Sequence, residues 1–394
     1  MNKPAKPTLN VMKGINQPSK INEEAVRKLR SDKYKHLSVE GFVNGSREGN
    51  RTILSKAITL VESSLRQHQE KSQEIIAECL KRSQAAREKE VQSIRQQATG
   101  NRLATGNRQE RAGTVRIGIT GVPGVGKSTF IEALGKYLTA NGHKLAVLAI
   151  DPSSIRSKGS ILGDKTRMEE LATDPNAFIR PSPSAGSLGG VARKTRETII
   201  LCEAAGFDVI LVETVGVGQS ETAVHSMVDF FLLLMLAGAG DELQGIKRGI
   251  IEMADAIFIN KADGDNIEKA GLAKTEYSNA LHLFPPNDSG WTPVVETCSA
   301  KTREGIIKVW KTIEDFCSFT QENGFFMRRR MEQDRQVLTD AIEESLRSNF
   351  HNRKDIAHQL KKLEALVVAG KISPYLAAKE LLDRYFEKSD RVTE

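Results

Sequence analysis

Short apolar runs rich in β-branched residues recur through the middle of the chain, and stretches with apolar residues at helical spacing separate them. This alternation predicts an α/β fold, a doubly wound and mostly parallel sheet with helices between the strands. Loops at the carboxyl ends of such strands usually hold the ligand. The predicted strands are residues 115–120, 145–150, 209–213, 231–235, 256–260 and 294–297.

Both flanks of this core have helical patterns and predict helical N- and C-terminal extensions. Residues 98–102 and 104–108 repeat the sequence ATGNR, which is typical of a flexible linker. Near the C-terminus, Ser373 and Pro374 provide an N-cap and a first-turn proline for a last helix. Apolar stripes on helices outside a complete core favour pairing with another subunit, although packing on the core is an equally good interpretation. The predicted regions are a polar, flexible tail (1–51), an N-terminal helical region (52–97), a flexible linker (98–113), the α/β core that contains the strands (114–320) and a C-terminal helical dimerisation region (321–394).

Composition narrows the class of protein. With 39% apolar and 27% charged residues, the 394-residue chain resembles a soluble globular protein. No run approaches the roughly 18 apolar residues that a membrane span needs. The four cysteines lie far apart without a CxxC pair, which argues against a disulfide framework or a zinc site. The sequence therefore predicts no membrane partner and a reducing compartment.

The net charge of +7 does not by itself indicate nucleic acid, because the basic residues are scattered and no aromatic residues interleave with them. We therefore expect no nucleic-acid partner. The N-terminus has no secretory apolar segment, and residues 1–22 hold four lysines and no acid. We expect the protein to be cytoplasmic, with the mitochondrial matrix as the alternative.

A complete phosphate-binding loop, GVPGVGKS, occupies residues 121–128 between a predicted strand and a predicted helix. Its glycines allow backbone N–H groups to surround phosphate oxygens, and the helix directs its positive dipole end at the anion. Lys127 would reach the β- and γ-phosphates, and the Ser128 hydroxyl would bind Mg²⁺. The predicted phosphate contacts are Gly121, Gly124, Val125, Gly126, Lys127, Ser128 and Thr129.

Two further loops indicate that the base is guanine. Residues 260–263 read NKAD after an apolar strand, and the Asp263 carboxylate can accept both guanine N1–H and N2–H. Residues 298–301 read CSAK after another strand, which matches the second guanine-contacting loop of GTPases. The sequence therefore predicts binding of GTP and GDP, and a doubly wound sheet of the P-loop GTPase type. The predicted base contacts are Asn260, Lys261, Asp263, Ser299, Ala300 and Lys301.

Acidic residues follow two strands at the same edge of the predicted sheet. One or both of Asp151 and Glu213 should hold Mg²⁺, directly or through water, together with Ser128. Asp164, in the long loop after Asp151, is a further candidate metal ligand, or else an ordinary helix cap. The N–H of Gly216 can sense the γ-phosphate.

The chain departs from Ras-like chemistry at one position. Those GTPases have a glutamine directly after the sensing glycine, and this glutamine orients the attacking water. Here Val217 takes that place and Gln219 follows two residues later. Because valine cannot orient water, we expect slow intrinsic hydrolysis, with Lys127, Glu213 and Gln219 as the catalytic candidates.

Several longer strings resemble the ArgK/MeaB-type GTPases, which protect and reload adenosylcobalamin-dependent methylmalonyl-CoA mutase. Similarity spans roughly residues 52–386. VETVGVGQSE and GDELQGIK are far more specific than the phosphate loop. The matching strings are GVPGVGKST (121–129), DPSS (151–154), GSILGDKTRM (159–168), RPSP (180–183), VETVGVGQSE (212–221) and GDELQGIK (240–247).

The resemblance implies a GTP-dependent gate on cobalamin delivery to the mutase, and a homodimer built with the C-terminal helices. It also implies switch loops near residues 151–168, 213–225 and 237–248. In the third, Asp241, Glu242, Gln244 and Lys247 are the candidate coupling residues. Ala237 stands where many family members have proline, and the linker and the N-terminal tail lie outside the shared pattern.

Other classes of protein remain as alternatives. A nickel-insertion GTPase would need clusters of His and Cys, whereas the seven histidines here are scattered. A kinase or transport-associated ATPase is disfavoured by Asp263, and a ribosome-associated GTPase is favoured only by the basic pI.

Overall fold

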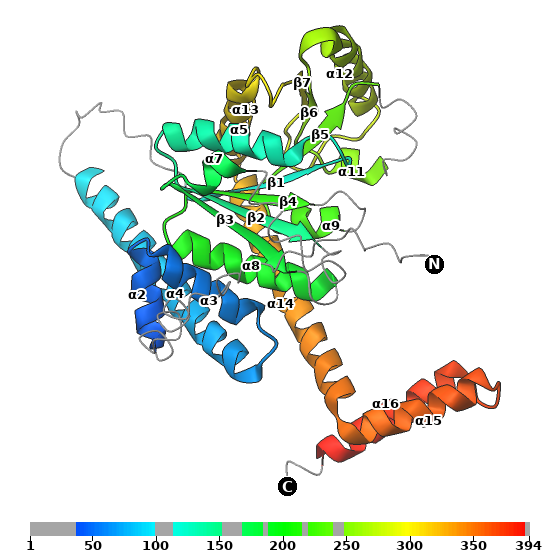
Figure 1. The fold of residues 1–394 in the computed structure, drawn as a ribbon. Helices are drawn as coiled ribbons and strands as arrows, with labels where there is room; N and C mark the ends of the chain where they lie inside the picture. Colours follow the sequence, from blue (N-terminus) through cyan, green and yellow to red (C-terminus); the bar gives the residue numbers. More distant parts are fainter. Residues whose placement is uncertain are drawn as a thin grey trace, which may run out of the picture.

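The centre of the molecule is a parallel β-sheet, as the sequence predicts. The structure is a computed structural model that describes residues 37–98, 113–151, 168–183, 188–214, 220–238 and 248–390. Seven strands lie in the order β3-β2-β4-β1-β5-β6-β7, with all neighbours parallel (Figure 1). Their carboxyl ends therefore meet at one edge. The strands are β1 (Val115–Gly121), β2 (Leu145–Asp151), β3 (Ala177–Pro183), β4 (Val209–Thr214), β5 (Phe230–Leu236), β6 (Ala256–Asn260) and β7 (Val294–Thr297).

Helices cover both faces of the sheet because its inner strands are apolar on both sides. On β5, Phe230 and Leu232 belong to the core on one face, whereas Phe231 and Leu233 belong to cores on the other. The first face is covered by α5 (Lys127–Ala140), α7 (Glu169–Ala172) and α13 (Ile306–Glu322). The second is covered by α8 (Leu188–Ala204), α9 (Ser220–His225), α11 (Arg248–Glu252) and α12 (Ile267–Leu281), the last preceded by the 3-10 turn η2 (Gly264–Asn266).

The strand at one edge of the sheet, β3, was not predicted. It contains Pro181 and Pro183, and proline counts against a strand because it cannot donate to the ladder. In the structure, Ala177 lies opposite Leu145, whose N–H donates to the Asn176 carbonyl at 2.8 Å. Alternate residues of a parallel ladder turn toward the partner, so residues 177, 179, 181 and 183 turn away from β2. Both prolines therefore lie where no ladder bond is lost.

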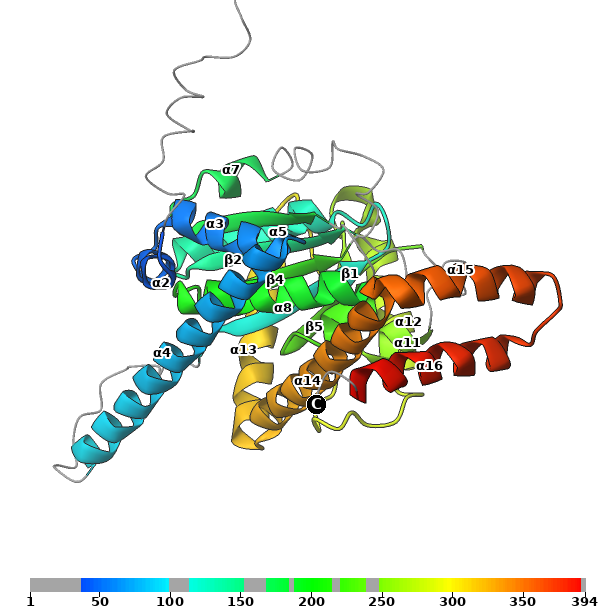
Figure 2. The ribbon, with the colours of Figure 1, turned by 90° about the horizontal axis from the view of Figure 1, so that it is seen from below.

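The N-terminal helices are α2 (Val39–Arg47), α3 (Arg51–Glu62) and α4 (Arg66–Ala98). They pack together outside α8, and α4 continues away from the sheet (Figure 2). The helical region begins earlier than predicted, because α2 lies within the segment assigned to a polar tail. Only Phe42 and Val43 are large apolar residues buried from α2, too few for a helical pattern to be visible in the sequence. Residues 1–36 and most of the predicted linker, 99–112, lie outside the described residues.

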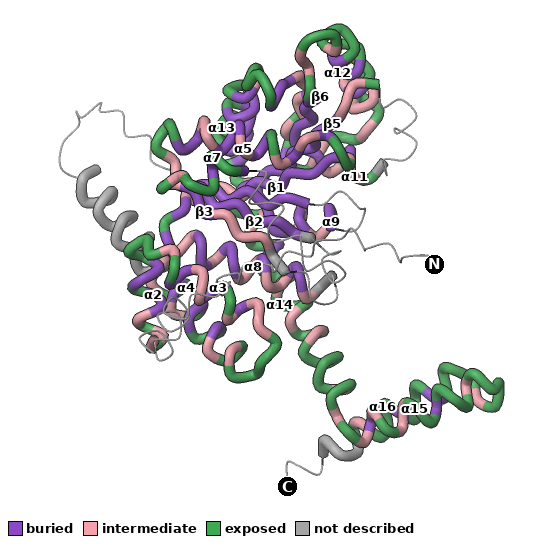
Figure 3. Tube along the Cα trace, in the orientation of Figure 1, coloured by how far each residue is buried: buried purple, intermediate pink, exposed green. Residues whose placement is uncertain are grey.

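The C-terminal helices leave the core. They are α14 (Phe325–Asn352), α15 (Lys354–Val368) and α16 (Pro374–Asp390). The last two form a hairpin with its own small core, at the far end of α14 and away from the sheet (Figure 1). The predicted cap of α16 is confirmed, because Ser373 Oγ accepts from the Leu376 N–H at 3.2 Å. Most of the distal half of α14 is exposed (Figure 3).

Of the helices in the described ranges, none is both long enough and apolar enough to cross a membrane.

Candidate nucleotide-binding site

The phosphate loop joins the end of β1 to the start of α5, as its sequence predicts. Gly121 ends β1 with a φ of 154°, and a Cβ there would lie 2.4 Å from the Leu234 carbonyl oxygen. Gly126 immediately precedes α5 in the left-handed region, with a φ of 90°. Side chains at these positions would clash or strain the backbone. The loop therefore requires glycine for its shape, with the N-terminus of a 14-residue helix behind it.

Lys127 closes the loop on itself. Its ammonium Nζ donates to the Gly121 carbonyl at 2.7 Å and to the Val122 carbonyl at 3.4 Å. The side chain is buried, and burial lowers the pKa of Lys127, while the Glu213 and Glu221 carboxylates oppose that fall. The carbonyl groups thus hold the ammonium group inside the loop, where it can bind the negatively charged oxygens of a phosphate.

Oxygen ligands suited to Mg²⁺ lie beside this lysine. Ser128 Oγ donates to Glu213 Oε1 at 3.4 Å, across the gap between α5 and β4. Glu213 lies opposite Ile119 of β1 and Ala149 of β2 in the sheet. Asp151, the last residue of β2, lies at the same edge, opposite Pro183 of β3 and one position beyond the last residue that pairs with β4. Hydroxyl and carboxylate oxygens are the donors that Mg²⁺ prefers, so Ser128 and Glu213 fit that ion.

The two predicted base loops are bonded to each other. Ser299 Oγ donates to Asp263 Oδ2 at 2.5 Å and accepts from the Thr302 N–H at 3.1 Å. The Ala262 N–H donates to the Cys298 carbonyl at 3.0 Å. Ser299 is fully buried, whereas Asp263 is partly exposed. A carboxylate has about four acceptor positions, so Asp263 retains the capacity to accept from a guanine.

The base loops are also bonded to the phosphate loop. Asn260 Nδ2 donates to the Val125 carbonyl at 2.8 Å, and Lys261 Nζ donates to the Gly124 carbonyl at 2.8 Å. The Ala300 N–H, a predicted base contact, donates to Asn260 Oδ1 at 3.1 Å. Lys301 is exposed at the end of this loop. The structure therefore brings the predicted phosphate and base residues to one edge of the sheet.

Other predicted residues cannot be located. Asp164, Gly216, Gln219, Asp241, Glu242, Gln244 and Lys247 all lie outside the described residues.

Sequence reasoning missed two groups at this site. Glu221, in the first turn of α9, is 3% exposed and is one of the two acids that act on the pKa of Lys127. Its position within the string VETVGVGQSE was the only signal for it. Thr214 Oγ1 donates to Thr120 Oγ1 at 2.8 Å, which joins the ends of β4 and β1 beneath the loops.

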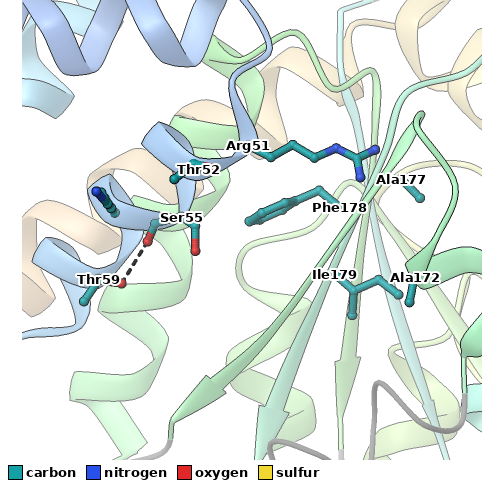
Figure 4. A pocket seen from close by; sticks show the side chains of 9 residues that line it. Arg51, Thr52, Ser55, Thr59, Ala172, Ala177, Phe178 and Ile179 are labelled. Atoms are coloured by element: carbon teal, nitrogen blue, oxygen red, sulfur yellow. Dashed lines mark hydrogen bonds between the residues drawn. The ribbon is translucent and has the colours of Figure 1, made fainter. Parts of the chain in front are cut away.

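A cavity of about 450 Å³ lies between α3 and the first half of β3 (Figure 4). Phe178 lines one wall, and the hydroxyls of Ser55 and Thr59 line the other. Those hydroxyls accept from Arg180 at 3.2 and 3.1 Å, next to its ion pair with Glu62. We interpret the cavity as a gap beneath the docked N-terminal helices, because its polar wall is bonded to the sheet.

Comparisons with known proteins agree with this geometry. Residues 85–355 match the family model described as methylmalonyl-CoA mutase-associated GTPase MeaB. A probable GTPase of Mycobacterium tuberculosis is 47% identical over 350 residues, which cover 88% of this chain and 95% of that protein. The mitochondrial methylmalonic aciduria type A homolog of Mus musculus is 44% identical over 355 residues, covering 90% and 81%. A crystal structure of an LAO/AO transport system kinase is 35% identical with a TM-score of 0.64, covering 88% and 97%.

Proposed function

Because the chain belongs to the MeaB family of methylmalonyl-CoA mutase-associated GTPases and is a GTP hydrolase, we propose that its GTP turnover gates the loading and protection of the mutase's cobalamin. Membership of this family is the observation that carries the proposal. The bonds between the base and phosphate loops support it, since they hold a guanine-reading carboxylate at a fixed distance from the phosphate cradle.

At the nucleotide site, we assign Mg²⁺ to Ser128 and Glu213, with Asp151 and Asp164 as further ligands. The ion would neutralise charge on the β- and γ-phosphates during hydrolysis. Lys127 would bind the same phosphates from the other side. The pair of Ser128 and Glu213, 3.4 Å apart, supports this assignment.

Hydrolysis would be slow without a partner. Val217 occupies the position from which a glutamine orients water in Ras-like proteins. Glu213 and Gln219 are the remaining candidates for that task. Slow intrinsic hydrolysis is suited to controlling cofactor loading, because GTP turnover would rise only when a partner completes the site.

The partner would be the mutase, and the contact would include Asp241, Glu242, Gln244 and Lys247. The test measures GTP turnover with and without purified mutase. Lys247→Ala and Gln244→Ala should bind GTP within about twofold of wild type, yet lose about fivefold or more of the stimulation by mutase. Lys269→Ala, which changes an exposed lysine on α12, is the matched control. Full stimulation of both variants would remove the coupling role from this loop, and no stimulation of the wild type would contradict the proposed gate.

We also propose a homodimer formed through the C-terminal helices. Leu338, Ile342 and Leu346 are four residues apart along α14 and are 63%, 52% and 59% exposed. Residues at this spacing form one helical stripe, and an exposed apolar stripe is typical of a subunit contact.

A nickel-insertion GTPase is the alternative function, and it would need clusters of His and Cys. In the described part of the chain, no group of three or more His, Cys, Asp or Glu side chains could hold a metal ion. For location, the cytoplasm remains our prediction, with the mitochondrial matrix as the alternative that the name of the mouse relative favours.

A further inference from the structure

The beginning of α14 holds the turn that connects α9 to β5, residues 226–229. Gln333 Nε2 donates to the Val228 carbonyl at 2.8 Å. Arg330 donates to both oxygens of Asp229, at 2.7 and 2.6 Å. Gln333 is 9% exposed and Asp229 is 2% exposed, so water does not compete for these bonds. The turn therefore cannot move independently of α14.

Arg196 of α8 adds a link between α9 and α14. Its Nη2 donates to Ser226 Oγ at 2.8 Å, and its Nη1 donates to Asp340 Oδ2 at 2.9 Å. Ser226 Oγ in turn donates at 2.8 Å to the carbonyl of Ala223, in the last turn of α9. One guanidinium, with its side chain 12% exposed, thus connects the end of α9 to the fifth turn of α14.

The other end of α9 lies at the nucleotide site. The helix begins at Ser220, directly after residues 215–219, the segment that contains Gly216 and Gln219. Glu221, in its first turn, acts on the pKa of Lys127. A helix of six residues is only about 9 Å long. Because α9 is so short, a movement of its C-terminal end also moves its N-terminal end.

We propose that Arg196, Ser226 and Asp340 are positioning residues for GTP hydrolysis, which hold α9 in a fixed relation to α14. The inference rests on the proposed role of residues 215–219 in hydrolysis. It gives the C-terminal arm, residues 341–390, a route to the nucleotide site that does not pass through residues 239–247. Because coupling is reciprocal, a change of the bound nucleotide should also change the contacts that Arg196 makes with α14.

The test uses intrinsic GTP turnover of the full chain without mutase. Asp340→Asn keeps the side-chain shape and removes the ion pair, whereas Ser226→Ala removes the other end of the link. Each should lower kcat by about three- to tenfold and leave KM for GTP within about twofold, because α9 is displaced and the binding loops are not. The double variant should lose no more than the larger single loss, since both act through Arg196.

Asp334→Asn, an exposed acid on the same helix, is the matched control and should turn over GTP normally. Hydrogen exchange should rise in residues 215–229 of the variants and stay unchanged in residues 121–130, whereas general destabilisation would raise both. Unchanged kcat in Asp340→Asn and Ser226→Ala would overturn the inference. Gly216→Ala separates this inference from the proposed role of residues 215–219. If Gly216→Ala loses GTP turnover while Asp340→Asn and Ser226→Ala do not, only the positioning role is wrong. If Gly216→Ala turns over GTP normally, the role of residues 215–219 in hydrolysis is wrong.

Discussion

At the scale of single residues, the choice of base depends on how one carboxylate is held. Ser299 Oγ donates to Asp263 Oδ2, and the Ser299 side chain is fixed in turn by the Thr302 N–H. A hydroxyl can donate to an amide oxygen as well as to a carboxylate oxygen. The loop should therefore keep its geometry when Asp263 is replaced by asparagine, and only the hydrogen bonds offered to the base should change.

We predict that Asp263→Asn converts the protein from a guanine to a xanthine specificity. Guanine would lose two charge-assisted bonds to the carboxylate, each worth about 1.5–3 kcal/mol. The new amide N–H₂ would instead donate to the C2 carbonyl of xanthine. Competition between fluorescent GDP and unlabelled GTP or xanthosine triphosphate measures both affinities.

The control for this variant is Asp265→Asn, an exposed acid in the same turn. It should keep the preference for GTP. If Asp263→Asn also keeps that preference, the base is read elsewhere in the site.

Residue types could be read from the sequence, but their contacts with each other could not. The strings at 121–128, 260–263 and 298–301 name the nucleotide loops, because each follows an apolar strand. The bond from Asn260 to Val125 joins residues 135 positions apart, and nothing local encodes it. Glu221 was missed for the same reason, since its influence on Lys127 depends on how α9 packs.

At the scale of elements, α14 is attached to the core at the amino edge of the sheet, opposite the nucleotide. Asp255 precedes β6 and accepts from the Phe231 N–H at 2.8 Å, and Arg329 of α14 approaches it at 3.4 Å. Burial raises the pKa of Asp255 to about 6, because the long contact with Arg329 and the N–H only partly offset the cost of the charge. This attachment is therefore sensitive to pH.

We predict that Asp255→Asn reveals this sensitivity. A folded pKa of about 6 against 3.8 in the unfolded chain means that the folded state binds the proton more tightly. The resulting stabilisation is complete below about pH 4 and is lost as pH rises through about 6. The stability of wild type relative to Asp255→Asn should fall by about 3 kcal/mol over that range.

Urea unfolding at several pH values between 4 and 7 measures this difference, because titrations common to both proteins cancel. Asp334→Asn, on the exposed side of α14, should show no such trend. A constant difference between wild type and Asp255→Asn would mean that the Asp255 pKa is the same in the folded and unfolded protein.

Elements were predictable where burial leaves a regular pattern. β4, β5 and β6 are buried along almost their whole length and begin with continuous apolar runs, so their sequences identify them. β3 was missed because proline is tolerated in a strand only at the edge of a sheet, and the sequence does not show which strand is the edge. α2 was missed because it buries few apolar side chains. In both cases, the neighbours that make the element stable lie far away in the sequence.

At the scale of the whole molecule, the C-terminal arm has more apolar surface than its own packing uses. The small core of the hairpin consists of Ile356, Leu363, Ala377 and Leu381. Val368 and Tyr375, close to the tip, are 88% and 89% exposed, and the stripe on α14 is also open to solvent. These residues belong to an arm that projects from the core and is largely exposed (Figures 1 and 3). The subunits of a symmetric dimer meet through the same surface patch on each copy, and exposed apolar residues are suited to such a contact.

We predict that the double variant Ile342→Asp, Leu346→Asp is a monomer. Two carboxylates in the stripe could be buried between subunits only at a cost of several kcal/mol, which exceeds what the lost apolar contacts supplied. Light scattering coupled to size exclusion should give about twice 43.4 kDa for wild type and 43.4 kDa for the variant. Glu343→Gln, a neighbouring substitution outside the stripe, should remain dimeric. The double variant should also bind GDP as wild type does, because the stripe is remote from the phosphate and base loops. A dimeric double variant would show that the subunits meet elsewhere. A monomeric wild type would contradict the proposed dimer and leave the arm free for another partner.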